Sequence, residues 1–299
     1  MKTFACAPML AAVLGAAAPA AEKHETQPFD RAKDLLSLHY DHAPDKDDGQ
    51  SAAADRTVLE SLFGADWIRE HVAAVSGAYG KNARSFNPKS DAVMDAAWKS
   101  CGGWIAAHRD RKRAVAELTR RWAVALRAGG DVWVKEGGQS DITADGVKAL
   151  RDRSPDADAS KRVHVVQHSV WNEKQTTDEA LAYVKKHTHY TKIKDANSYL
   201  NVKGGNQAFV EAAVGHPVFG PVWRAAFAYY DPRERLDFSD TGELLHILGL
   251  GEMSIDAFRK RFLEKRGDAL AERVAVGGHP PAAVSPDGAR RASPPAKLR

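Results

Sequence analysis

Apolar and polar residues alternate along the chain in segments that predict strands and helices in turn. Short apolar runs, typical of buried strands, lie at 35–38, 131–135 and 162–166. Other segments repeat apolar residues every three or four positions, which predicts helices. These helical segments lie at 55–62, 91–128, 141–150, 176–186 and 253–265. Strands that alternate with helices predict an α/β fold, in which helices flank a mostly parallel sheet in Rossmann-like layers.

Polar residues cluster directly after each of the three strand-like runs. The clusters occupy 41–48, 136–141 and 167–172. In a parallel sheet the carboxyl ends of the strands share one edge, and ligand sites form in the crevice outside that edge. The pattern therefore predicts that the three clusters contribute to one site.

The first cluster crowds four aspartates, Asp41, Asp45, Asp47 and Asp48, into eight positions. Repulsion among neighbouring carboxylates costs free energy unless water, a cation or a reaction compensates for it. One interpretation is an oxygen-ligand site for a hard cation such as calcium, although the spacing differs from that of an EF-hand. The alternative is a solvated turn in which Asp47 or Asp48 stabilises the N-terminus of the next helix.

The two ends of the chain have compositions of their own. Residues 1–20 combine a basic start, an Ala/Leu-rich run and the small-residue pattern Ala18-Pro19-Ala20, which predicts a secretory signal peptide. Residues 277–299 are rich in Pro, Ala and Arg and lack apolar periodicity, which predicts a disordered tail. A single α/β domain is expected over 21–276, in a periplasmic or secreted protein.

Charge and cysteine content narrow the classes of partner. The net charge of +4 comes mostly from the tail and from Lys2, so the body is near neutral and nucleic-acid binding is not expected. No segment after the leader reaches the ~18 consecutive apolar residues of a membrane span. Of the two cysteines, Cys6 lies in the leader, and Cys101 is expected to serve packing rather than chemistry.

Several further residues are candidates for a ligand site, each with a structural alternative. Glu136 and Gln139 flank a Gly-Gly pair that lets backbone approach a ligand, or they begin a helix. His168, Trp171 and Asn172 suit sugar recognition, because a tryptophan face packs on a sugar ring, or they are packed in the core. Asn197 lies in a polar segment that either closes over a pocket or forms an ordinary loop.

Zinc is a weaker alternative to calcium. His39 with Asp41 and His42, or the pair His187 and His189, can supply nitrogen ligands, but neither group has H-E-x-x-H spacing. The sequence also contains no G-x-S-x-G elbow, Walker loop or G-x-G-x-x-G fingerprint.

Three motifs in this order resemble the nucleoside-hydrolase-like superfamily. They are the acidic turn Asp41-His42-Ala43-Pro44-Asp45-Lys46-Asp47-Asp48, the strand end Val132-Trp133-Val134-Lys135-Glu136-Gly137-Gly138, and Ser239-Asp240-Thr241 with the following Leu245 and Leu248. The closest resemblance is to the nucleoside-hydrolase-like domain of secreted bacterial proteins described as cellulose-binding. It covers most of the body and implies a site that binds calcium and a sugar.

The resemblance implies roles for individual residues. Asp41, Asp47, Asp48 and Asp240 correspond to metal ligands, and Asp41 or Asp45 to the base that activates water. Ala43 and Ser239 stand where the family carries an aspartate and a histidine. The expected function is a calcium-dependent hydrolase of an N-ribosyl or other glycosidic bond, acting on a small sugar or nucleoside-like substrate. The alternative is a carbohydrate-binding protein without turnover, and either form can assemble as a homo-oligomer.

Overall fold

A six-stranded parallel sheet forms the centre of the protein, for which the computed structural model describes residues 28–44, 46–77 and 79–264. The strands lie in the order β3-β2-β1-β4-β5-β6. They are β1 (Leu35–Tyr40), β2 (Val72–Ser76), β3 (Ile105–Ala106), β4 (Val132–Gly137), β5 (Val163–Gln167) and β6 (His189–Lys192). This architecture confirms the predicted α/β class with Rossmann-like layering.

The direction in which the sheet grows reverses between β1 and β4. The chain first builds outward from β1 through β2 to β3, and it then returns to β4 on the other side of β1. The helices that follow β1 and β4 therefore lie on opposite faces, and a crevice opens between the carboxyl ends of these two strands. Tyr40 at the end of β1 pairs with Gly137 at the end of β4, so both strands end at the same level.

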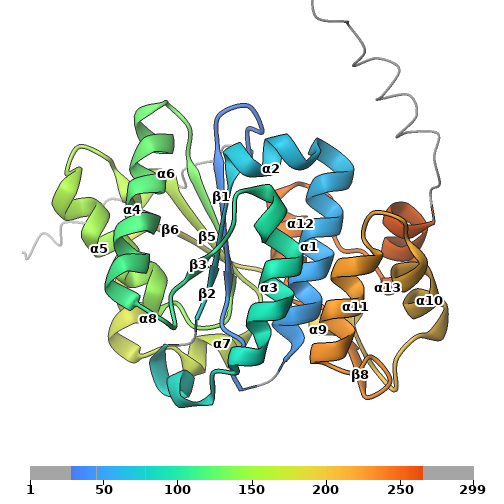
Figure 1. Cartoon of the computed structure of the whole chain (residues 1–299). Helices are drawn as coiled ribbons and strands as arrows, with labels where there is room; N and C mark the ends of the chain where they lie inside the picture. The colour runs from blue at the N-terminus through green and yellow to red at the C-terminus, as the bar shows by residue number, and fades with distance from the viewer. Residues whose placement is uncertain (1–27, 45, 78, 265–299) are drawn as a thin grey trace, which may run out of the picture.

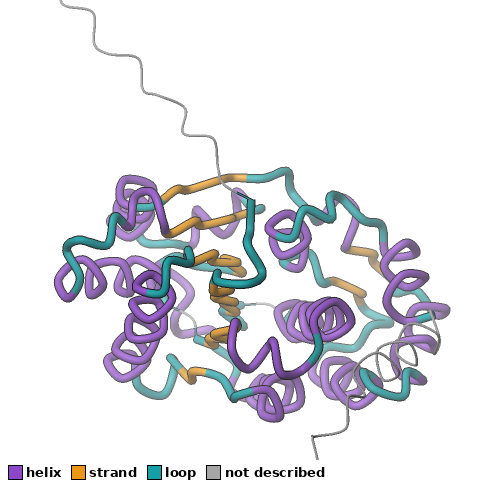
Figure 2. Tube along the Cα trace, turned by 90° about the horizontal axis from the view of Figure 1, so that it is seen from above, coloured by secondary structure: helices purple, strands orange, loops and turns teal. Residues whose placement is uncertain are grey.

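Helices cover both faces of the sheet (Figures 1 and 2). One face carries α4 (Arg111–Arg127), α5 (Asp141–Arg153), α6 (Ala159–Arg162) and α8 (Asp178–His187). The other carries α1 (Asp47–Phe63), α2 (Ala65–His71), α3 (Asp91–Trp98), α11 (Gly220–Tyr229) and α12 (Thr241–Ile247). A short helix, α7 (Val170–Gln175), follows β5.

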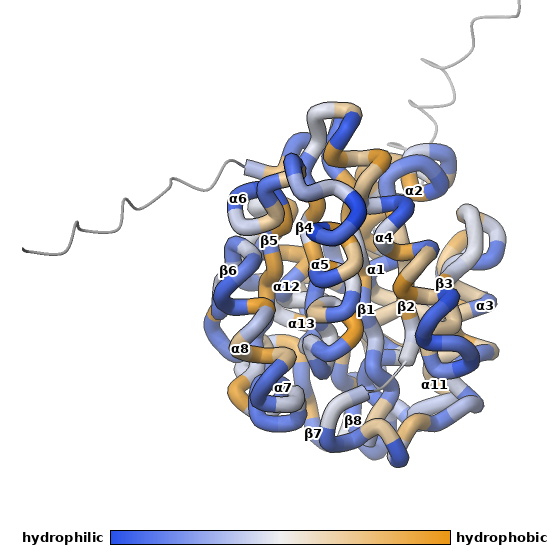
Figure 3. The backbone as a smooth tube through the Cα atoms, turned by 90° about the vertical axis from the view of Figure 1, so that its left-hand side faces the viewer, coloured by the Kyte–Doolittle hydropathy of each residue, from blue (hydrophilic) through white to orange (hydrophobic). Residues whose placement is uncertain are grey.

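Alternate strand residues feed two separate cores, one for each face of the sheet. Leu36, Leu38 and Tyr40 of β1 pack with α1, α3 and α11, whereas Leu35 packs with the helices of the opposite face. Successive side chains of a strand point to opposite faces, so strands covered on both sides are apolar at nearly every position. The hydrophobic stretches of the chain accordingly run through the centre of the molecule (Figure 3).

The C-terminal third extends the layer around α1. It contains α9 (Asn197–Leu200), the antiparallel pair β7 (Asn201–Lys203) and β8 (Arg235–Asp237), α10 (Gln207–Gly215), α13 (Ile255–Phe258) and a π turn (Arg259–Leu263). Trp223 of α11 is fully buried, and its indole donates a hydrogen bond of 3.0 Å to Thr57 of α1. This contact fixes α1, whose first turn carries two of the clustered aspartates.

Several sequence-based predictions are confirmed. The runs at 35–38, 131–135 and 162–166 correspond to β1, β4 and β5, and helices α5 and α8 occupy their predicted segments. Thr177 caps α8, and its side chain accepts a hydrogen bond from the Ala180 amide. Cys101 is a free thiol buried in the core, as expected for a residue that serves packing.

Other predictions differ from the structure. The helical pattern at 91–128 is divided into α3 and α4, because Gly102 and Gly103 adopt positive φ angles of 101° and 83° between them. Ile105 belongs to β3 rather than to a helix. The helix predicted over 55–62 begins at Asp47, where acidic side chains favour a helix N-terminus. The strand β2 was not predicted, because no turn residue separates it from α2.

Some predictions fall outside the described residues. These are the signal peptide at 1–20, the tail at 277–299, and Asp45. Within the part of the chain that is described, every helix lacks the length or the apolar character needed to cross a membrane.

Candidate functional site

A polar cavity of about 160 Å³ opens where the sheet reverses its direction, at the carboxyl ends of β1, β4 and β5. Asp41 follows β1, Gly137 ends β4 and Gly138 follows it, and His168 follows β5. Its remaining lining residues are Asp47, Asp48, Ser169, Trp171, Asn172, Asn197, Arg235, Asp237, Ser239 and Asp240. Residues of all three predicted clusters therefore border one cavity, the second cluster through Gly137 and Gly138.

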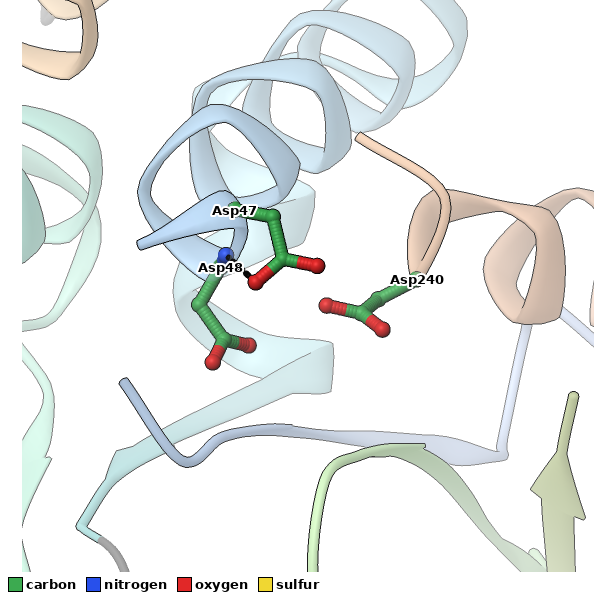
Figure 4. Close-up of side chains that lie close together, drawn as sticks. All are labelled: Asp47, Asp48 and Asp240. Atoms are coloured by element: carbon green, nitrogen blue, oxygen red, sulfur yellow. Dashed lines mark hydrogen bonds between the residues drawn. The ribbon is translucent and has the colours of Figure 1, made fainter. Parts of the chain in front are cut away.

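Three carboxylates meet inside this cavity, and we call Asp47, Asp48 and Asp240 the acidic triad. Each offers one oxygen atom, and the three oxygens lie within 4.8 Å of one another. Asp47 and Asp48 come from the first turn of α1, and Asp240 precedes α12 on a far-separated part of the chain (Figure 4). Such a set of oxygen ligands can hold a metal ion. Asp47 and Asp48 are thus compatible with both interpretations of the acidic turn. They lie in the first turn of α1, and they belong to the set of oxygens that can hold a cation.

Asp48 and Asp240 are the buried members of the triad, and the surroundings of Asp48 favour a bound cation most clearly. Asp48 is 2% exposed, and its Oδ2 accepts a hydrogen bond of 2.6 Å from the His42 amide. Its Oδ1 receives no hydrogen bond from any described residue. Burial, together with the charges of Asp41 and Asp240, raises the pKa of Asp48 well above its usual value. A divalent cation would satisfy this oxygen and offset that repulsion.

Asp240 is ionised by a different environment. His168 Nε2 lies 3.0 Å from Asp240 Oδ1, and the Ser51 hydroxyl donates a hydrogen bond of 3.3 Å to Oδ2. Burial alone would raise the pKa of Asp240, but the hydrogen bond from His168 and the charge of Lys135 hold it below its usual range. His168 and Lys135 therefore favour the ionised form of Asp240.

His168 is held between two carboxylates. Its Nε2 faces Asp240, its Nδ1 lies 3.3 Å from Asp195 Oδ1, and its amide donates a hydrogen bond of 2.9 Å to Glu243 Oε1. Burial disfavours a charged imidazole, but the hydrogen bonds to Asp195 and Asp240 outweigh it and raise the pKa of His168 to about 10. Each ring nitrogen thus faces a carboxylate, and the ring orients Asp240 in the cavity.

Asp41 lies at the cavity wall beside the triad. Its Oδ1 accepts a hydrogen bond of 2.8 Å from the Ala43 amide, and its Oδ2 accepts one from the side chain of Gln139. Gln139 itself does not line the cavity and acts beneath Asp41. Gln139 therefore contacts Asp41 and not the cavity, whereas the sequence predicted that it would contact the substrate.

Glu136 lies on the other face of the sheet. It is completely buried, its Oε1 lies 3.2 Å from His39 Nδ1, and the Thr143 hydroxyl donates a hydrogen bond of 2.9 Å to the same oxygen. Because side chains alternate along a strand, Glu136 points away from the face under α1 and α12. The geometry therefore does not place it at the cavity, contrary to the predicted substrate contact.

Neither of the two groups suggested as zinc ligands gathers as a metal site among the described residues. His39 is engaged with Glu136, whereas His187 ends α8, where its Nδ1 lies 3.0 Å from Arg151 Nη1. His189 starts the edge strand β6. Within the described ranges, the acidic triad is the group of His, Cys, Asp or Glu side chains that gathers as a metal site.

The predicted sugar-recognition residues lie at the cavity. Trp171 is 40% exposed on the first turn of α7, so its ring is open to a ligand. The side-chain amide of Asn172 donates a hydrogen bond of 3.3 Å to Gln167 Oε1, and the side-chain amide of Asn197 donates one of 2.9 Å to Asp195 Oδ1. Both amides are thereby oriented at the cavity wall.

Arg235 and Asp237 also line the cavity, outside the three predicted polar clusters, and Ser169 lines it from within the third cluster. Arg235 and Asp237 belong to β8, and they alternate with apolar residues in the segment Arg235-Leu236-Asp237-Phe238-Ser239. This period of two is typical of a strand with one polar face and was the available signal. Its short length hid the strand within a segment that otherwise resembles a helix.

The Gly137-Gly138 pair allows the backbone of β4 to approach the aspartates. A Cβ atom at Gly138 would lie 2.2 Å from Asp41 Oδ2, and Gly138 has a φ angle of 120°. We expect Gly138→Ala to displace Asp41, which lies beside the triad, and to weaken the binding of a divalent cation at least about tenfold, or about 1.4 kcal/mol. Calcium titration by calorimetry measures this effect.

Gly103→Ala is the matched control for that substitution. Gly103 also has a positive φ, 83°, but no atom lies within 4 Å of the added Cβ. Both variants carry backbone strain, and only Gly138→Ala adds a collision in the cavity. Equal calcium affinity in the two variants would show that the Gly138 contact is unimportant.

Comparisons of this chain with protein-family models, with curated proteins and with solved structures find no match.

Proposed function

We propose that this protein is a secreted, calcium-dependent hydrolase of an N-ribosyl or other glycosidic bond. The observation that supports this proposal is the acidic triad, which closes an oxygen-ligand site at the crevice of a parallel sheet. The resemblance of the acidic turn and of the Asp240 segment to the nucleoside-hydrolase-like superfamily agrees with it.

The residues present fit a calcium ion, since the triad offers three oxygens and Asp48 Oδ1 has no hydrogen-bond donor among the described residues. Asp47, Asp48 and Asp240 would hold the ion. When bound, calcium would orient a water molecule and sugar hydroxyls and lower the cost of deprotonating that water. It is a hard cation that accepts irregular sets of oxygen ligands.

The chain's own residues would supply the remaining chemistry. Asp41 lines the cavity beside the triad and would take the proton of the attacking water. The water oxygen would bond to the anomeric carbon while the leaving group departs with the bonding electron pair and takes up a proton from solvent. Carboxylates around the cavity stabilise the oxocarbenium-like charge of this transition state. Trp171, Asn172 and Asn197 would bind the sugar, with the indole against the ring and the amides toward hydroxyls.

One observation favours the second candidate, a carbohydrate-binding protein without turnover. Both oxygens of Asp41 already accept hydrogen bonds, from the Ala43 amide and the Gln139 side chain. These contacts compete with the attacking water for the Asp41 oxygens. In addition, Ser239 at the cavity cannot donate a proton to a leaving group as a histidine can.

One experiment separates these functions. The purified protein is incubated with a panel of nucleosides, glycosides and cell-wall oligosaccharides, with calcium or with a chelator, and free sugar is measured. Calcium-dependent sugar release supports the hydrolase. Binding of calcium and sugar without release supports the carbohydrate-binding alternative, and absence of calcium binding contradicts both.

Trp171→Ala tests the sugar face of the cavity. We expect the affinity for the sugar that binds best to fall about two- to tenfold, because an aromatic contact contributes about 0.5–1.5 kcal/mol. Calcium affinity and thermal stability should stay unchanged. Val170→Ala is the matched control, because Val170 is a 51% exposed neighbour that does not line the cavity. Equal losses in both variants would exclude Trp171 as a sugar contact.

A further inference from the structure

Lys135 is a completely buried lysine in the middle of the central strand β4. Its side chain lies on the face of the sheet under α1, where its Nζ is 3.4 Å from Asp55 Oδ2. The ammonium also lies 4.1 Å from the centre of the Tyr40 ring, a cation–π contact. Lysines are almost never fully buried without a charged partner, because removing the ammonium from water is costly.

The same ammonium lies beneath the acidic triad. A Cβ atom placed on Gly137 would be 2.9 Å from Lys135 Nζ and 3.2 Å from Asp48 Oδ1. Both atoms thus border the same small space above the Gly137 backbone. Neither Lys135 Nζ nor Asp48 Oδ1 has a hydrogen-bond partner among the described residues. A buried ammonium that is ion-paired with Asp55 and a buried carboxylate oxygen without a hydrogen bond therefore lie close together.

The groups packed around Lys135 are predominantly acidic. Asp48 and Asp55 come from α1, and Asp240 and Glu243 come from the start of α12. Burial lowers the pKa of Lys135, but Asp55, Asp240, Glu243 and Asp48 together raise it above its usual value. Lys135 in turn helps to hold Asp240 ionised. These carboxylates therefore favour the charged form of Lys135, and the ammonium interacts electrostatically with Asp48 and Asp240 of the triad.

We propose that the Lys135 ammonium is a built-in counter-cation of the acidic triad. It compensates the triad's negative charge when no metal is bound, and its repulsion weakens the affinity of the triad for a divalent cation. This inference deepens the proposed function, because it rests on the triad being the calcium site. A fixed internal cation and an incoming calcium ion act on the same carboxylates, so each reduces the gain from the other.

Lys135→Met tests this inference by keeping the length of the side chain and removing its charge. We expect calcium to bind at least about tenfold more tightly than in the wild type, as measured by calorimetry. In thermal denaturation, the metal-free variant should unfold at a lower temperature than the wild type, and added calcium should raise its Tm by a larger amount.

The double variant Lys135→Met/Asp55→Asn guards against misfolding, since it leaves no uncompensated carboxylate at Asp55. It is compared with Asp55→Asn alone, which retains the lysine, and the double variant should bind calcium at least about tenfold more tightly. Lys148→Met controls for net charge, because Lys148 forms an exposed ion pair with Glu179 and should leave calcium affinity unchanged.

The outcomes separate this inference from the proposed function. Tighter calcium binding in the variants without Lys135 supports the counter-cation. Equal or weaker binding in those variants, with calcium bound by the wild type, overturns the role of Lys135 and leaves the calcium site in place. If no variant and no wild-type protein binds calcium, the counter-cation and the proposed function both fail.

Discussion

Asp240→Asn is expected to reduce calcium affinity on the order of a hundredfold, or about 2.7 kcal/mol. The substitution removes one of three charged ligands, and the affinity of oxygen-ligand sites depends on how many carboxylates they contain. An asparagine oxygen can still accept the hydrogen bond from His168, which lies 3.0 Å from Asp240 Oδ1. The fold should therefore persist, and calorimetry of calcium binding measures the change.

Asp231→Asn is the matched control for this prediction. It makes the same change in charge at an aspartate that pairs with Arg233, outside the lining of the cavity. Calcium affinity should be unchanged in this variant. If Asp240→Asn bound calcium as tightly as Asp231→Asn, Asp240 would not be a ligand. The proposal that the acidic turn and the Asp240 segment form one metal site would then be wrong.

Trp223→Ala is expected to lower the free energy of unfolding by about 3–5 kcal/mol, the usual cost of truncating a buried tryptophan. Trp223 packs edge-on against Phe209 and Phe238, and it is completely buried. Its indole also donates to Thr57, so the substitution removes a hydrogen bond between α11 and α1. Chemical denaturation followed by circular dichroism measures the loss.

The calcium affinity of the folded Trp223→Ala variant should stay within about threefold of the wild-type value, or about 0.7 kcal/mol. Trp223 does not line the cavity, and α1 retains its other contacts with the sheet. Val124→Ala is the control for stability, because Val124 is 49% exposed and its loss should change stability by no more than about 0.5 kcal/mol. A similar stability in both variants would contradict the role of Trp223 in fixing α1.

Part of the fold could be predicted because it depends on local patterns. The apolar runs of β1, β4 and β5 are strong signals, since strands buried on both faces tolerate few polar residues. The strand β2 and the short strand β3 escaped prediction. β2 follows a helix directly, and β3 contains two residues that owe their extended form to pairing with Val75 and Ser76.

The candidate site was partly predictable for a topological reason. Polar residues after parallel strands meet at one sheet edge, which placed Asp41 and His168 in one cavity from the sequence alone. Glu136 and Gln139 also lie near this sheet edge in sequence, but neither side chain lines the cavity. The side chain of Glu136 is directed by strand alternation to the opposite face, where it contacts His39 and Thr143.

By itself, the sequence determined the α/β class, the sheet edge that carries the site and the crowding of the first-turn aspartates. These properties follow from the order of apolar and polar residues along the chain. The family resemblance already implied that Asp240 shares a metal site with the acidic turn, and the tertiary structure brings the three carboxylates together. That Lys135 lies near Asp48 was decided by the tertiary structure alone. Such contacts join residues far apart in sequence, and packing of α1 and α12 on β4 sets their distances. A local pattern carries no information about either.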